Sequence, residues 1–173
     1  MTGKTHLIGG AATAALLITG GAEVSVAMVG ACLTGSLLPD IDHFHSKISN
    51  QNIGTKVASG LIGILFGHRG FTHTPIFIAL VGAFMYILTK DIPELMFASS
   101  LVIPLCCGML SHLILDTLNP MGILWAWPLS KKYINIASIR TGSAGEFIVA
   151  SLMSAALLAA GIKELTPFLA SIL

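Results

Sequence analysis

The chain has 173 residues, of which 54% are hydrophobic and only 10% are charged. Soluble domains carry charges on about a quarter of their residues, so this composition excludes an ordinary soluble protein and predicts an integral membrane protein. The formal net charge is only +1, and without a basic stripe the sequence gives no case for nucleic-acid binding. The length predicts one domain covering residues 1–173.

Long apolar stretches alternate with short polar connections at 7–22, 24–38, 75–89, 95–115 and 147–162. We expect an all-α, polytopic membrane bundle of about four or five transmembrane helices, arranged as two antiparallel hairpins and a C-terminal helix. Several stretches are shorter than the roughly 20 residues that cross the hydrocarbon core. Pro104 predicts a kink in the fourth stretch.

Four polar segments lie at the ends of these stretches and contain all six histidines: residues 5–6, 39–45, 68–74 and 111–116. Following the chain through the two hairpins brings all four segments to one membrane face. Ionisable groups beside a membrane span are costly and are commonly functional, and histidine with carboxylate is the ligand set of a hydrolytic metal site. The pattern predicts one metal site at that face.

Basic residues are unevenly distributed between the two faces. Seven fall on the face of the polar segments, and only Lys90 and Lys163 fall on the other. By the positive-inside rule, the predicted site faces the cytoplasm of a bacterial inner membrane.

His112 and Asp116 are four residues apart, so a helix presents both side chains on one face. Asn119 and Pro120 end this helix and leave Asp116 in its last turn, where the helix dipole disfavours a carboxylate unless a cation compensates it. These residues therefore predict metal ligands. The alternative is a polar cap at the helix end.

Asp40 and Asp42 flank Ile41, and His43 follows directly. Two neighbouring carboxylates repel each other unless a cation lies between them, so these three polar residues are candidate ligands, with Asp40 the stronger of the two acids. The alternative is a turn capped by aspartate side chains.

His73 directly precedes a predicted helix that has Thr72 or Thr74 as its N-cap, and it is a further candidate ligand. A helix N-terminus beside an arginine binds anions, so Arg69 and His68 are predicted to contact a phosphate. The alternative for Arg69 is an interfacial anchor.

His6 precedes the first stretch and lies opposite Asp40 across the predicted hairpin, which makes it a candidate ligand. Glu146 is interpreted either as the acid of a capping box that begins at Ser143, or as a metal ligand or general base. Arg140 is predicted to neutralise charge on a phosphoryl oxygen.

Together these segments resemble the LexA-regulated, membrane-bound metal-dependent hydrolases, the YdjM-like family. The resemblance rests on Thr5-His6, Leu38 to His43, His68 to Thr74, Ser111 to Asp116 with Asn119-Pro120, and Arg140 to Ser143 with Glu146. It implies an inner-membrane protein of the SOS response with metal-dependent hydrolase activity.

A more distant similarity is to zinc-dependent phospholipase C, whose His-x-x-x-Asp pair is matched by His112 and Asp116. The His-x-x-x-Glu pair of that enzyme has no counterpart, because the residue four before Glu146 is Gly142. One or two ions are therefore expected rather than three.

The leading hypothesis is a phospholipase-like hydrolase that cleaves a phosphoester of a membrane lipid or lipid-linked substrate. Its cofactor would be one or two divalent ions, zinc foremost, with manganese or iron as alternatives. The predicted metal ligands are His6, Asp40, Asp42, His43, His73, His112 and Asp116, and the predicted catalytic residues are His68, Arg69, Arg140 and Glu146. The alternatives are a metal-binding membrane transporter or sensor without hydrolytic activity, and a structural membrane protein in which these side chains only cap helices.

Overall fold

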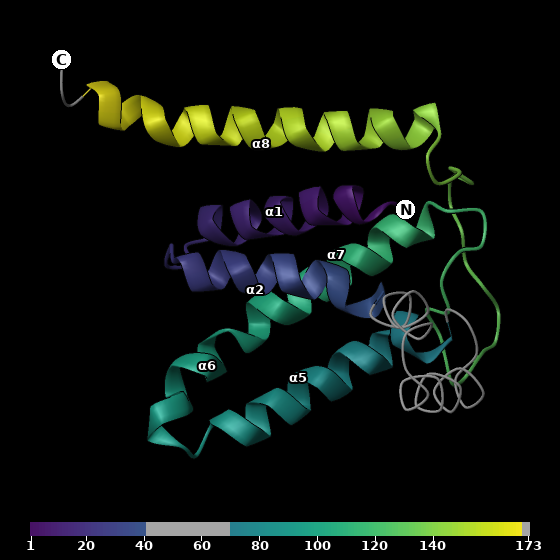
Figure 1. The fold of residues 1–173 in the computed structure, drawn as a ribbon, viewed down its shortest axis with the longest axis horizontal. Helices are drawn as coiled ribbons and strands as arrows, with labels where there is room; N and C mark the ends of the chain where they lie inside the picture. The colour runs from purple at the N-terminus through teal and green to yellow at the C-terminus, as the bar shows by residue number, and fades with distance from the viewer. Residues whose placement is uncertain (41–69, 171–173) are drawn as a thin grey trace, which may run out of the picture.

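The computed structural model describes residues 1–40 and 70–170, and the regular elements in these ranges are all helical (Figure 1). The α-helices are α1 (Gly3–Thr19), α2 (Val26–Leu37), α5 (Pro75–Thr89), α6 (Met96–Ser100), α7 (Val102–Thr117) and α8 (Ala144–Ala170). Three short 3-10 helices join them: η1 (Leu38–Asp40), η2 (Phe71–His73) and η3 (Pro93–Leu95). The all-α prediction is thus confirmed for these residues.

Side-chain hydroxyl groups cap the N-termini of three helices. Thr2, Ser25 and Thr74 are the N-caps of α1, α2 and α5, and each accepts a hydrogen bond from a backbone N–H in the first turn. Pro75 follows Thr74 at the first helical position, where its missing N–H costs no hydrogen bond. Of the two threonines considered from the sequence, Thr74 is therefore the cap.

The helices form two antiparallel hairpins, α1 with α2 and α5 with α6 and α7, and α8 lies along α1 (Figure 1). Helix α7 is central, because it contacts α1, α2 and α5. As a result, α1 and α5 begin at the end of the bundle where α2 and α7 finish, and α8 starts at this end too (Figure 1).

Two glycines allow α2 and α7 to approach closely. A Cβ atom added to Gly35 would lie 2.1 Å from the Leu105 carbonyl oxygen, and one added to Gly108 would lie 2.2 Å from the Cys32 carbonyl oxygen. Such small-residue contacts replace the hydrophobic effect as the basis of helix association in lipid. They also fix the relative height of the two helices.

Two helical segments are long and apolar enough to span a membrane, Met96–Thr117 and Ala144–Gly161. The second is almost entirely exposed, as expected for a helix surrounded by lipid. The apolar helices Val26–Asp40 and Pro75–Thr89 are shorter. The structure thus supports two spans by length and composition, and the prediction of four or five is not confirmed.

The kink predicted from Pro104 takes the form of an interruption of the helical segment Met96–Thr117 at Leu101, which ends α6 and precedes α7. A proline has no N–H to donate to the carbonyl four residues earlier, here that of Ser100, and its ring crowds this carbonyl. Pro104 then lies in the first turn of α7, where backbone N–H groups have no intrahelical acceptor and a proline is tolerated.

Candidate metal centre

Five of the predicted ligands lie together at the end of the bundle where α2 and α7 finish (Figure 1). They come from α1, η1, η2 and α7 and are His6, Asp40, His73, His112 and Asp116. Asp40 is 20% exposed, whereas the other four side chains are at most 1% exposed. The cluster is therefore buried, and Asp40 is its most exposed member.

Four of these side chains direct one atom each to a common point. The Nε2 atoms of His73 and His112 are 3.2 Å apart. Asp40 Oδ1 lies 3.3 and 3.7 Å from these two nitrogens, and Asp116 Oδ2 lies 3.8 and 3.7 Å from them. Ligands placed about 2.0–2.1 Å from a tetrahedral zinc ion are about 3.3 Å from one another. Two groups of three ligand atoms share His112, namely His73–His112–Asp116 and His6–Asp40–His112, and the histidine–carboxylate distances are close to this spacing.

Both histidines are oriented by hydrogen bonds from their other nitrogen. His112 Nδ1 donates to the Ser36 carbonyl oxygen at 2.8 Å, so Nδ1 carries a proton and Nε2 faces the cluster. His73 Nδ1 is hydrogen-bonded to Thr72 Oγ1 at 3.0 Å. Metal-bound histidines are commonly held in this way, which fixes the tautomer and the ring orientation.

Asp116 is oriented similarly through its second oxygen. Oδ1 accepts a hydrogen bond from Asn119 Nδ2 at 2.7 Å and contacts the Met1 amino group. From the sequence, Asn119 was predicted only to end the helix. It lies just beyond the end of α7, three residues after Asp116, and this short separation is the signal for its further role.

His6 is fully buried and stacks on His112, with ring centroids 3.7 Å apart and an interplanar angle of 13°. Its Nε2 lies 3.4 Å from Asp116 Oδ1, yet neither ring nitrogen makes a hydrogen bond within residues 1–40 and 70–170. A buried polar atom without a partner costs about 1–3 kcal/mol. A ring nitrogen in this position fits a metal ligand.

Asp40 lies in η1, beyond the end of α2. Burial raises the pKa of its carboxyl, but the hydrogen bond with His73 and the nearby imidazoles of His112 and His6 outweigh this effect and lower the pKa to about 2. Asp40 is therefore a carboxylate at neutral pH, as a ligand for a divalent ion must be.

Glu146 is at the start of α8, where it holds the start of α1. Its carboxylate accepts hydrogen bonds from Thr5 Oγ1 and from the Gly142 N–H, both at 2.6 Å, and from the backbone N–H of Thr2. Ser143 Oγ in turn accepts from the Glu146 N–H at 3.5 Å. These contacts match the capping interpretation and extend it, because they also join two helices.

We expect Glu146→Ala to lower the free energy of unfolding by about 1–3 kcal/mol, because it leaves buried donors without an acceptor. Thermal unfolding of the purified protein in detergent measures this loss. Glu23→Ala removes an exposed acid at the other end of the bundle, and should change stability by no more than about 0.5 kcal/mol. Full stability of Glu146→Ala with loss of activity would instead indicate a catalytic role.

Of the other predicted site residues, the structure also describes Arg140, whose side chain is exposed in the segment that precedes α8. Asp42, His43, His68 and Arg69 lie outside the described residues.

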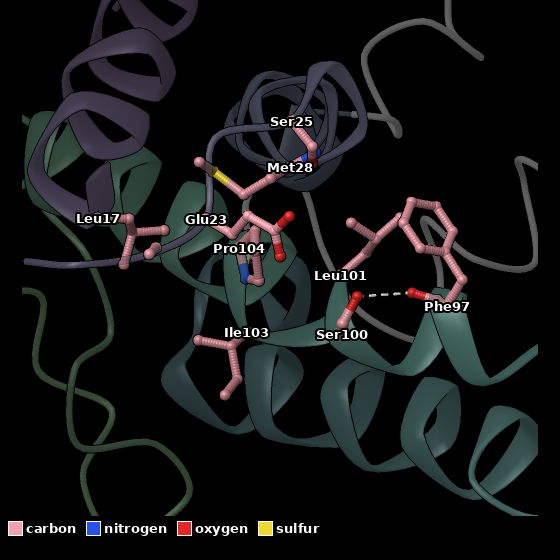
Figure 2. A pocket seen from close by; sticks show the side chains of 10 residues that line it. Leu17, Glu23, Ser25, Met28, Phe97, Ser100, Leu101, Ile103 and Pro104 are labelled. Carbon is pink, nitrogen blue, oxygen red and sulfur yellow. Dashed lines mark hydrogen bonds between the residues drawn. The ribbon is translucent and has the colours of Figure 1, made fainter.

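A cavity of about 390 Å³ lies at the opposite end of the bundle, between the α1–α2 turn and the start of α7 (Figure 2). Its lining is mainly apolar and includes Leu17, Met28, Phe97 and Leu101, with Glu23 beside them. It contains none of the clustered histidines or aspartates. The convergence of ligand atoms, and not this cavity, therefore locates the candidate site.

Comparison with known proteins shows the family of this chain. The family described as "YdjM inner membrane protein" matches residues 1–173, the whole chain. This chain belongs to the YdjM family. The resemblance identified from the sequence motifs is thereby confirmed at the level of the family, and membership supports a location in the bacterial inner membrane.

Two relatives of the YdjM-family chain illustrate the similarity. "Uncharacterized protein YvsG" of Bacillus subtilis is 37% identical over 151 residues, which cover 86% of this chain and 87% of that protein. "Inner membrane protein YdjM" of Escherichia coli is 34% identical over 102 residues, which cover 58% of this chain and 49% of that protein. No solved structure matches the chain significantly.

Proposed function

We propose that this protein is a metal-dependent hydrolase of the bacterial inner membrane whose ion would be held by His73, His112 and Asp116, with Asp40 beside them. The supporting observation is that one ligand atom from each of these three residues lies in a single group, and that Asp40 Oδ1 also lies 3.3 and 3.7 Å from the two histidine nitrogens. Two imidazoles with two carboxylates suit zinc, and also iron or manganese.

A second ion would involve His6. Asp116 has Oδ2 near His73 and His112, and Oδ1 near His6. If two ions are bound, Asp116 would contribute to holding both. We therefore propose one or two ions, with His6 required only for the second.

A bound divalent ion lowers the pKa of a water molecule and polarises the scissile group. Asp40 is the most exposed member of the cluster, so we propose that the substrate would approach past this residue. Arg140, exposed in the segment that leads into α8, would neutralise negative charge on a phosphoryl oxygen.

The proposed substrate is a phosphoester of a membrane lipid or lipid-linked molecule. The cluster lies at the ends of apolar helices rather than among their middles, which corresponds to headgroup depth in a chain that crosses the membrane several times. The excess of basic residues at this end supports a cytoplasmic orientation.

A transporter is less well supported. Transporters place ionisable groups near the middle of the membrane, at interrupted helices. The sequences of α2 and α5 contain no charged residue, and α7 contains none before Asp116, in its last turn.

The experiment is to purify the protein without a metal-binding tag, measure metal per chain by elemental mass spectrometry, and screen lipid phosphoesters for hydrolysis. We expect about one or two ions per chain. Treatment with a chelator should abolish hydrolysis, and added zinc, manganese or iron should restore it. A protein that neither contains nor takes up metal would exclude the hydrolase proposal, whereas metal binding without hydrolysis of any phosphoester would leave only a structural or sensory site.

A further inference from the structure

The segment that joins α7 to α8, residues 118–143, has an unusual charge distribution. It contains Lys131, Lys132 and Arg140, and no acidic residue occurs between Asp116 and Glu146. The segment lies at the same end of the bundle as the metal cluster (Figure 1). All charged side chains of this segment are therefore basic, and the segment lies beside the candidate site.

Backbone hydrogen bonds hold this segment in place on α7. Ile123 and Ile134 pair through two hydrogen bonds of 2.9 Å. The Ile136 N–H donates to the Thr117 carbonyl at 3.0 Å, and the Ile139 N–H donates to the Leu118 carbonyl at 2.7 Å. These hydrogen bonds hold the segment against the end of α7, directly after Asp116.

The outward side of the segment combines apolar and basic side chains. Leu129 is 95% exposed and Ile136 is 77% exposed, and Lys131 and Lys132 between them are also exposed. The inward side is apolar as well, because Ile123 is buried. Exposed apolar side chains next to cations are typical of a surface that inserts into the headgroup region of a membrane.

We propose that residues 118–143 bind anionic phospholipid in the leaflet around the candidate site. Lys131 and Lys132 contact lipid phosphates, and Leu129 and Ile136 insert beside the acyl chains. The charge is complementary to an anionic leaflet, and the chain belongs to an inner-membrane family. A soluble acidic protein would explain the lysines but not the two apolar side chains beside them.

Both tryptophans of the chain lie in this segment, and they also connect it to the site. Trp125 Nε1 donates to Thr117 Oγ1 at 2.8 Å, and the Trp127 ring meets Phe71 edge-to-face at 5.5 Å. Aromatic rings of this kind favour the membrane interface. The fluorescence of Trp125 and Trp127 can therefore report contact between this segment and lipid.

The test is quenching of tryptophan fluorescence by brominated phospholipids. The full chain is reconstituted into vesicles that contain either brominated phosphatidylglycerol or brominated phosphatidylcholine at equal mole fraction. We expect a preference for phosphatidylglycerol that falls about fivefold for each lysine replaced in Lys131→Gln and Lys132→Gln, since one cation near an anionic surface contributes this much.

Two comparisons make the result specific. Lys90→Gln removes a lysine that is paired with Asp91 at the other end of the bundle, and should leave the preference unchanged. Leu129→Ser should reduce quenching by both lipids while the preference persists. Circular dichroism of each variant verifies an unchanged helix content.

Equal quenching by the two lipids, or a preference that survives in the Lys131→Gln, Lys132→Gln double variant, would overturn the proposal. Accessibility to aqueous iodide without any quenching by brominated lipid would also overturn it, and would point to a soluble partner. The readout is fluorescence, so it does not depend on the metal site or on hydrolysis.

Discussion

His112→Ala is expected to lower the metal affinity of the purified protein by about 100-fold or more, because it removes a direct ligand and even residues that only orient ligands contribute 10–100-fold. His112 Nε2 lies within 3.7 Å of ligand atoms from Asp40, His73 and Asp116. The substitution also leaves the buried Ser36 carbonyl without the hydrogen bond from His112, so we expect about 1–3 kcal/mol lower stability. Elemental mass spectrometry and thermal unfolding measure the two effects.

Asp40→Ala separates these effects. Asp40 is the partly exposed member of the set, so its loss should reduce metal affinity while costing less stability than His112→Ala. An exposed lysine, as in Lys4→Ala, provides the control for substitution at the same end of the bundle. Unchanged metal content in both the His112→Ala and Asp40→Ala proteins would mean that any bound ion lies elsewhere.

The convergence of His6, Asp40, His73, His112 and Asp116 could be predicted from the sequence because it depends on a simple rule. Apolar stretches that cross a bundle in alternate directions return their flanking residues to the same end. Polar residues at such positions then carry an unusually clear signal, since burying them needs a compensating interaction.

The supporting contacts could not be predicted in the same way. His112 is oriented by the backbone carbonyl of Ser36, and every residue type offers such a carbonyl. Glu146 could be interpreted from sequence as a cap or as a catalytic group, because its role depends on what lies across from it. The structure brings Thr2, the N-cap of α1, and Thr5, in its first turn, to this carboxylate, although both are more than 140 positions away in sequence.

Helix boundaries could be predicted only in part. Pro104 predicted a kink in the stretch 95–115, and the helix is interrupted at Leu101, three residues before this proline. Hydropathy is continuous across this interruption, so hydropathy alone does not locate it. Apolar residues favour burial in either conformation, so composition predicts membrane contact better than it predicts helix boundaries.

Gly108→Ala is expected to separate α2 from α7 and to weaken the metal centre from a distance. The new Cβ would lie 2.2 Å from the Cys32 carbonyl oxygen and 3.0 Å from the Ser36 backbone nitrogen. Both are backbone atoms and cannot move aside, so we expect a loss of about 3 kcal/mol, at the upper end of the usual cost of overpacking. Displacement of α2 would also move the Ser36 carbonyl away from His112 Nδ1 and lower metal affinity by about 10–100-fold.

Gly30→Ala is the matched control, because Gly30 lies in α2 and an added Cβ there meets no atom within 4 Å. Alanine favours helix more than glycine by about 0.8–1.0 kcal/mol, so this variant should keep full metal affinity and equal or greater stability. Metal affinity is measured by competition with a chromogenic chelator, and stability by thermal unfolding. If Gly108→Ala lost stability but bound metal as tightly as Gly30→Ala, the Ser36 carbonyl would not be what orients His112. If neither property changed, the close contact between α2 and α7 would itself be wrong.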